Sequence, residues 1–426
     1  MQKLIGKDLL LVGFTLFSMF FGAGNLIFPP MLGAAAGSNF WLAFLGLAVS
    51  AIGLPIAGVI AAAKAGGLKE LAGRVHPLFA QVFMILIYLS IGPCLAIPRT
   101  ASTSFEMLVP LLGSSPALQL GYSILFFTAA FLVALHPDKL TEFLGRFLCP
   151  ALIALILLLF AGCLFCPLAS GYGTPTAVYA SLPTAEGVLY GYQTMDALAA
   201  LIFGAVIGLN IQARGITEET AVRRGTIRAG FVAGIMLLIV YAMLGHAGAQ
   251  TGAAVPGLST GADVLTTLAQ TLFGKAGLVL LAAMFLIACF NTCVGLIACV
   301  GQYFHELLPR IPYPVIAAFF AFASMLISNI GLAGILRVST PILNAVYPIA
   351  IMLILLSFVP HLERRRAVYP LCIGFTAAQS ICAALPLGIL STAAGLLPFS
   401  SIGFGWVLPA LAGLALGCLI SKKEVH

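Results

Sequence analysis

The sequence predicts an all-α integral membrane protein with about twelve membrane-spanning helices, and three observations support this prediction. Only 8% of the 426 residues are charged and 61% are hydrophobic, whereas a soluble protein carries about 25% charged residues. Twelve apolar segments are long enough to span, since a spanning helix needs about 20 residues. Basic residues gather in alternate connections between these segments. A soluble globule and a disordered chain are therefore both excluded.

The twelve segments divide the chain into spans and short connections. They run over residues 9–35, 39–63, 77–105, 117–135, 143–166, 187–211, 226–249, 276–303, 312–330, 333–358, 367–390 and 401–420. The first is too long to be the apolar part of a secretory signal, so we expect it to be retained as a span. The longest connections, 167–186 and 250–275, are expected outside the membrane on its outer face.

The basic residues predict the orientation of the chain. With a cytoplasmic N-terminus, 17 of the 20 Lys and Arg residues fall on the inner side, as expected for cytoplasmic loops. We therefore predict a multi-pass protein of the plasma (cell inner) membrane with both termini in the cytoplasm. The run Arg364–Arg366 then lies near anionic lipid, so no nucleic-acid partner is expected.

Two glycines and two prolines predict a break in the first span. In the run FFGAGNLIFPP, Pro29 and Pro30 lack backbone donors, and Gly22 and Gly24 let the chain leave helical geometry. Unwound backbone at membrane depth occurs where it is buried or lines a cavity. A kink with glycines for close helix packing explains the same residue types equally well.

A second break is predicted in the sixth span, within the run GYQTMDALAAL at residues 191–201. Asp196 is ionisable at membrane depth, which marks it as a functional candidate. Alternatively, its carboxylate caps the helical half that follows. Breaks five spans apart are typical of a transporter site between inverted repeats. We predict one membrane domain over 1–426, with repeats at 9–166 and 187–358 and two extra helices within 367–420.

Two further spans carry polar residues. In the eighth, Asn291 and Thr292 offer neutral oxygens suited to a sodium ion, and Ala288 lies one turn earlier on the same face. Hydrogen bonding between helices is the commoner role of such a pair. In the third, we expect Arg99 to extend to the outer headgroups; pairing with Glu106 and gating of an outer vestibule are the alternatives.

These motifs carry a resemblance to a known family. The stretches FFGAGNLIFPP (20–30), GPCLAIPRT (92–100), GYQTMDALAAL (191–201) and YPIAI (347–351) look like those of the branched-chain amino acid:cation symporters, the system II carrier proteins. That family is similar to the amino acid–polyamine–cation superfamily. The resemblance implies a five-plus-five inverted repeat with broken first and sixth helices, followed by two more helices. It also implies symport of leucine, isoleucine and valine with sodium.

The resemblance implies a site residue by residue. The amino acid would be held by backbone and side chains at Gly22, Ala23, Gly24, Asn25, Tyr192, Gln193 and Met195. Asp196 fits the motif and joins the substrate-binding candidates, although the cation or the helix end are alternative partners. Sodium would lie among Ser18, Phe21, Ala288, Asn291 and Thr292. Asn291 departs from the superfamily, which commonly has a hydroxyl there, and this puts the affinity or the choice of ion in doubt.

Other functions are weighed against this one. A proton-coupled carrier, or a carrier of another small neutral solute, is the nearest alternative. A channel would show polar rings in a symmetric oligomer, and an intramembrane enzyme would need a cluster of reactive groups. The spans offer essentially Asp196, so we expect no enzyme. The chain has no P-loop, so transport must use an ion gradient. No cofactor besides the coupling ion and no required protein partner are expected.

Overall fold

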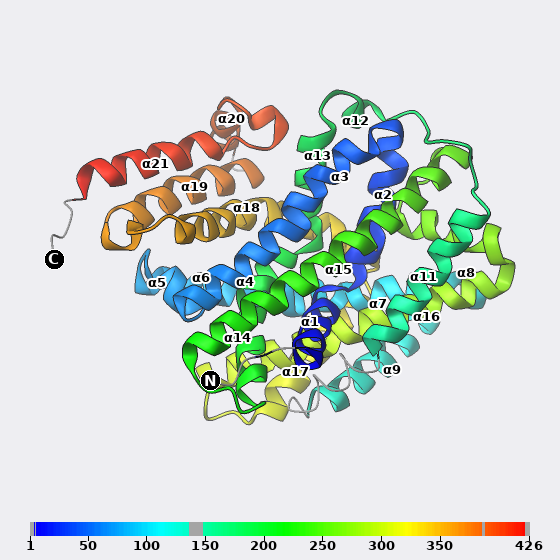
Figure 1. The fold of residues 1–426 in the computed structure, drawn as a ribbon, viewed down its shortest axis with the longest axis horizontal. Helices are drawn as coiled ribbons and strands as arrows, with labels where there is room; N and C mark the ends of the chain where they lie inside the picture. Colours follow the sequence, from blue (N-terminus) through cyan, green and yellow to red (C-terminus); the bar gives the residue numbers. More distant parts are fainter. Residues whose placement is uncertain (1–3, 5, 136–147, 386–387, 422–426) are drawn as a thin grey trace.

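The computed structural model describes residue 4 and residues 6–135, 148–385 and 388–421. Throughout this part the regular structure is helical (Figure 1). The helices of the first half are α1 (Lys7–Phe20), α2 (Ala23–Ala36), α3 (Phe40–Ala48), α4 (Leu54–Ala65), α5 (Leu68–Gly73), α6 (Pro77–Leu89), α7 (Ala96–Glu106), α8 (Val109–Leu112), α9 (Pro116–Ala134) and α11 (Cys149–Phe165).

The second half continues in the same way. Its helices are α12 (Ala177–Ser181), α13 (Pro183–Gly191), α14 (Asp196–Gln212), α15 (Glu219–Ala254), α16 (Gly261–Leu307), α17 (Tyr313–Ser328), α18 (Leu332–Phe358), α19 (Val368–Ala384), α20 (Ile389–Gly395) and α21 (Val407–Ile420). Short 3₁₀ or π turns join several of them, at 37–39, 49–53, 90–94, 192–194, 362–364 and 400–402. Figure 1 shows α19, α20 and α21 together at one edge of the molecule beside α18.

The predicted fold class is confirmed. Among the described residues, six helical segments are long and apolar enough to cross a membrane, and two bent pairs raise this number to eight. The shorter apolar helices α11, α17 and α21 fall within three of the remaining predicted spans. Residues 143–147 of the predicted fifth span lie outside the described part of the chain.

The helices pack in pairs that follow the expected repeat. In the first span α2 packs on α15, the seventh span, while α13 and α14 of the sixth span pack on α3 and α4 of the second. In a repeat of five spans, span 1 corresponds to span 6 and span 2 corresponds to span 7. The contact between spans 1 and 7 therefore corresponds to the contact between spans 6 and 2. The same correspondence relates the contact of α9 with α16 to the contact of α17 with α7. The repeat bounds 9–166 and 187–358 stay a prediction.

Glycines bring both corresponding pairs into close contact. A Cβ at Gly33 on α2 would overlap the carbonyl oxygen of Gly245 on α15. A Cβ at Gly187 on α13 would likewise overlap the carbonyl oxygen of Ala43 on α3. Small residues at such crossings are the usual means by which membrane helices approach closely. Both broken spans are thereby held against a continuous neighbour.

The predicted connection at 250–275 is largely helical, because α15 continues to Ala254 and α16 begins at Gly261. Its place outside the membrane stays a prediction. A capping box starts α16: Asp263 N–H donates to Thr260 Oγ1 at 3.1 Å, and Thr260 N–H donates to Asp263 Oδ2 at 3.0 Å. Gly274, with φ of 58°, then bends the helix. The bend separates the segment 261–273 from the predicted span at 276–303.

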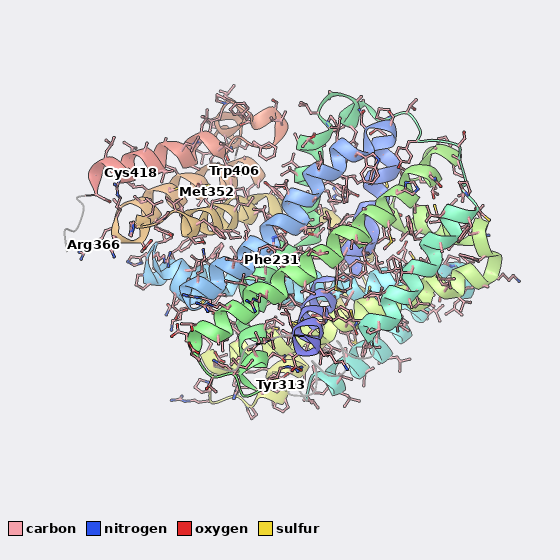
Figure 2. The ribbon with its side chains drawn as sticks, viewed as in Figure 1. Phe231, Tyr313, Met352, Arg366, Trp406 and Cys418 are labelled. Atoms are coloured by element: carbon pink, nitrogen blue, oxygen red, sulfur yellow. The ribbon has the colours of Figure 1, made fainter. Side chains whose placement is uncertain are left out.

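The surface of the molecule carries large apolar side chains. Phe231 on α15, labelled in Figure 2, is 52% exposed, and Leu125 on α9 is 71% exposed. A water-soluble monomer rarely exposes so many large apolar side chains in continuous patches. These faces suit contact with lipid, so the polar groups at membrane depth are turned inward.

Candidate functional site

The first span is broken where the glycines predict it. Helix α1 ends at Phe20 and α2 begins at Ala23, with Gly22 in an extended conformation (φ −121°, ψ −155°). The N–H of Gly22 donates to Asn25 Oδ1 at 3.1 Å, which caps α2. Pro29 and Pro30 lie within α2 without breaking it. The break therefore falls at the glycines, and the prolines follow it.

The sixth span is also broken. Helix α13 ends at Gly191, residues 192–194 form a 3₁₀ turn, and α14 begins at Asp196 with a bend of 48°. Met195 joins the two halves in the left-handed conformation, with φ of 66°. This conformation is costly for a residue with a side chain and persists only where the surroundings impose it, often at functional sites.

Asn25 and Asp196 connect the two breaks. Asn25 Nδ2 donates to Asp196 Oδ2 at 2.5 Å. Tyr241 on α15 accepts a hydrogen bond from Asn25 Nδ2 and donates to the same carboxylate oxygen at 3.1 Å. All three side chains are at least 97% buried. The carboxylate thus binds side chains of α2 and α15, rather than capping α14 as the alternative interpretation supposed.

The prediction that Arg99 extends to the outer headgroups is wrong. Its side chain does not reach the outer headgroups: only 4% of the residue is exposed, and it points at the break in the sixth span. Nη1 donates to the carbonyl oxygen of Gln193 at 2.8 Å, and Nη2 donates to that of Thr194 at 3.4 Å. The guanidinium lies 5.5 Å from the ring centre of Phe28. A kink at Gly92, next to Pro93, precedes α7.

A small cavity lies between the two breaks. Its volume is about 30 Å³, and the predicted residues on its wall are Gly22, Ala23, Gly24, Asn25, Met195, Asp196 and Thr292. Arg99, Thr100 and Thr194 also line it. This is room for one or two water molecules. We call it the central cavity; it is too small for an amino acid in this conformation.

The predicted cation residues lie beside the central cavity. Asn291 Nδ2 donates to Ser18 Oγ at 2.8 Å, which joins α16 to α1. Asn291 Oδ1 and Thr292 Oγ1 are buried oxygens without a hydrogen-bond partner. Phe21, directly after α1, and Ala288 on α16 are fully buried. Buried polar atoms normally have partners, so two adjacent unpaired oxygens fit a sodium ion, which oxygen ligands suit.

Tyr192 and Gln193 have their side chains elsewhere. Both line a second cavity of about 420 Å³ between α13, α18 and the C-terminal helices, which we call the outer cavity. Thr340 on α18 donates to Gln193 Oε1 at 3.4 Å, and Tyr192 stacks on Tyr347 with ring centres 4.6 Å apart. Trp406, labelled in Figure 2, lines the same cavity. The backbone carbonyl group of Gln193 nevertheless faces the central cavity's wall, because it accepts the hydrogen bond from Arg99.

Two functional candidates were missed by sequence reasoning. Tyr241 lies in an apolar run, where a tyrosine is usually a packing residue, and no motif marks it. For Arg99 the sequence predicts a path to the headgroups, whereas the structure places its side chain against the break in the sixth span. The available signal is its place directly after Pro98, a few residues beyond the kink at Gly92.

Comparison with known proteins gives a consistent picture. The sequence profile of the family described as branched-chain amino acid transport protein matches residues 5–424. The branched-chain amino acid permease BraB of Bacillus subtilis is 39% identical, with 97% of this chain and 96% of the permease aligned. The permease BrnQ of Escherichia coli K12 is 35% identical over 98% of this chain and 96% of its own length.

Solved structures share the fold. The nucleobase-cation-symport-1 family transporter Mhp1 superposes with a TM-score of 0.61, covering 96% of this chain and 91% of Mhp1 at 12% identity. MhsT in complex with L-phenylalanine gives a TM-score of 0.54, covering 98% of this chain and 99% of MhsT at 16% identity. At these identities the likeness concerns the arrangement of helices.

Proposed function

This chain belongs to the branched-chain amino acid transport protein family, and from that premise we propose that it imports leucine, isoleucine and valine by symport with sodium. As a member of this family it is a multi-pass membrane transporter and not an enzyme. The proposal adds the substrate, the coupling ion and the direction. It also places the protein in the plasma membrane with both termini in the cytoplasm, as the distribution of basic residues supports.

The observation that carries the proposal is the meeting of two helix breaks at one buried cavity. Helices α2 and α14 both begin at the central cavity, so their free N–H groups favour negative charge there. The preceding halves end at the same place and present carbonyl groups. A zwitterionic amino acid needs both kinds of group close together, and paired half-helix ends supply them.

The preference for branched aliphatic side chains follows from the rest of the cavity wall. Phe20, Phe203, Ile91 and Leu296 line it alongside the polar groups. Such a pocket distinguishes side chains differing by one methylene only about 10–200-fold. One carrier is therefore expected to accept leucine, isoleucine and valine, each with somewhat different affinity.

Sodium coupling is supported by the unpaired oxygens next to the cavity. Asn291 Oδ1 and Thr292 Oγ1 would contribute ligands, together with backbone carbonyls at the end of α1. Thr292 also lines the central cavity, where a Cβ on Gly22 would lie 2.5 Å from its Oγ1. A cation at this position would touch the unwound segment that binds the amino acid, and this contact would couple the two binding events.

Proton coupling is the second candidate, and Asp196 favours it. A buried carboxylate between two helix breaks is a group whose protonation can be linked to transport. Asn25 and Tyr241 donate hydrogen bonds to it from α2 and α15. The unpaired oxygens of Asn291 and Thr292 have no role in a purely proton-coupled carrier, so we favour sodium.

Transport requires this conformation to open. The central cavity of about 30 Å³ is far smaller than an amino acid, so substrate enters only when the walls move. The breaks provide hinges at Gly22 and Met195, because one half of each span can move while the other half stays packed. Alternating access then exposes the same site to each side in turn.

Uptake into proteoliposomes tests the proposal. Labelled leucine is supplied outside vesicles that carry an inward gradient of sodium, lithium or potassium, or of protons at equal salt. We expect accumulation with sodium and its loss when the gradient is collapsed. Accumulation driven by the proton gradient alone would favour the second candidate. Absence of leucine uptake under every gradient would refute both.

A further inference from the structure

Arg99 and Asp196 place two opposite formal charges on the wall of one buried cavity. Both line the central cavity, and each is at least 96% buried. In the described part of the chain the two make no ion pair within 4 Å of each other. Each is instead held by separate neutral groups. The two charges attract each other without direct contact. Burying a charge that has no directly bonded charged partner is costly, so their separation calls for a physical explanation.

The guanidinium has unused capacity for an acceptor. Two of its nitrogens donate to the carbonyl oxygens of Gln193 and Thr194. The third, Nε, is buried without a partner. Arginine offers five N–H donors in a flat fork that matches a carboxylate. Its acceptors here are uncharged carbonyls, so the positive charge remains available to an anion in the cavity.

The two charges flank the first turn of α2. A Cβ on Gly24 would lie 2.8 Å from Arg99 Nη2, so the guanidinium rests against the backbone at that residue. The next residue, Asn25, holds Asp196. The N-terminus of α2 thus lies between the guanidinium of Arg99 and the carboxylate of Asp196. The guanidinium is suited to the carboxylate of an amino acid, and the carboxylate of Asp196 is suited to its ammonium group.

From this geometry we propose that Arg99 binds the carboxylate of the transported amino acid, with Asp196 facing its ammonium group. The proposal rests on the function proposed above and adds a charged side chain to the backbone groups assigned there. Arg99 then determines specificity, because the carrier rejects aliphatic molecules that lack a carboxylate. When substrate binds, its carboxylate contacts Nε and replaces part of the contact with the carbonyls of Gln193 and Thr194.

The alternative is that Arg99 only tethers the break in the sixth span. Leucine and leucinamide separate these roles, since leucinamide keeps the ammonium and the side chain but has a neutral amide. Binding of both is measured by competition against labelled leucine with saturating sodium. The variants are Arg99→Gln and Arg99→Lys. The matched control is Arg337→Gln, which removes an exposed arginine from the membrane helix α18.

We expect wild type and Arg337→Gln to bind leucine at least tenfold more tightly than leucinamide. Arg99→Gln should weaken leucine binding by roughly 10- to 150-fold, the range for a lost charged hydrogen bond, and leucinamide binding by less than about threefold. Arg99→Lys, which lacks the flat fork, should fall between them. The proposal would be overturned if the variants bound leucine and leucinamide with equally reduced affinity. It would also be overturned if Arg99→Gln and Arg99→Lys kept the wild-type preference for leucine over leucinamide.

A double variant tests whether Arg99 serves only to neutralise the charge of Asp196. If Arg99 serves only to neutralise Asp196, adding Asp196→Asn to Arg99→Gln should restore leucine binding. Under the proposal leucine binding stays at least as weak as in Arg99→Gln, because no positive group meets the carboxylate and the group facing the ammonium is also lost; restored binding would overturn the proposal. Should Arg99→Gln not yield folded protein, the ligand preference of Arg99→Lys decides. Sodium-driven leucine uptake by wild type is measured first: its absence refutes the proposed function, whereas its presence with an unchanged preference in the variants refutes only the role of Arg99.

Discussion

Replacement of Asn25 by alanine is expected to disconnect the two helix breaks. This side chain accepts from Gly22 N–H at 3.1 Å, donates to Asp196 at 2.5 Å and donates to Tyr241. A buried hydrogen bond to a charged group contributes about 1.5–3 kcal/mol, and a neutral one contributes about 1 kcal/mol. The variant should therefore lose about 3–5 kcal/mol of unfolding free energy, together with sodium-driven leucine uptake.

The pairing with Asp196 is isolated by a double-mutant cycle. Asn25→Ala, Asp196→Asn and the double variant are unfolded by denaturant titration in mixed micelles. Because the two side chains are in contact, the double variant should be less destabilised than the sum of the single variants, by about 1–3 kcal/mol. Asn39→Ala is the matched control: Asn39 Nδ2 donates to the carbonyl oxygen of Tyr179 at 3.0 Å, and neither residue lines either cavity.

The control should lose only about 1 kcal/mol and retain uptake. If Asn25→Ala unfolds no more easily than Asn39→Ala, the bridge between the breaks contributes nothing measurable. If the single effects of Asn25→Ala and Asp196→Asn simply add, the two residues are not coupled. Either result would refute the reasoning that joins the two broken spans through Asn25.

Three further predictions concern single contacts. Gly24→Ala places a Cβ 2.8 Å from Arg99 Nη2, so leucine affinity should fall at least tenfold; wild-type affinity would show that the guanidinium moves away freely. Asn291→Ala removes an unpaired oxygen and should raise the sodium concentration for half-maximal uptake about tenfold, whereas an unchanged sodium dependence would exclude this oxygen as a ligand. Asp8→Asn removes the ion pair between Asp8, whose side chain is 67% exposed, and Arg214, whose side chain is 26% exposed. Because the pair is largely solvated, the unfolding free energy should change by less than about 1 kcal/mol. Abolished folding would contradict that prediction.

Much of the fold was predictable because lipid imposes strict rules on a chain. Span length and the scarcity of charge indicated the helices, and the glycines near Gly22 and Gly191 indicated the breaks. These signals are local, because glycine permits unwound backbone whatever its distant neighbours are. The helical structure within 250–275 has a local cause too, because the capping box at Thr260 starts a helix that hydropathy alone does not reveal.

The site was less predictable because it depends on which helices face each other. The sequence shows that Arg99 directly follows Pro98, but its hydrogen-bond partners, Gln193 and Thr194, are more than 90 residues away. Tyr241 has no distinguishing pattern, and its role follows from contact with Asn25 and Asp196. The left-handed conformation of Met195 is likewise imposed by packing rather than by residue type. Such groupings become visible only once the helices are packed.

Equilibrium binding of leucine with and without sodium tests the central proposal most directly. If the amino acid and the cation occupy adjoining parts of one site, each must tighten the binding of the other by the same factor. We expect the Kd for leucine to fall at least fivefold as sodium rises from zero to saturation at constant ionic strength, and leucine to strengthen sodium binding equally. A Kd for leucine that is identical with sodium and with an inert cation would contradict sodium symport through this site.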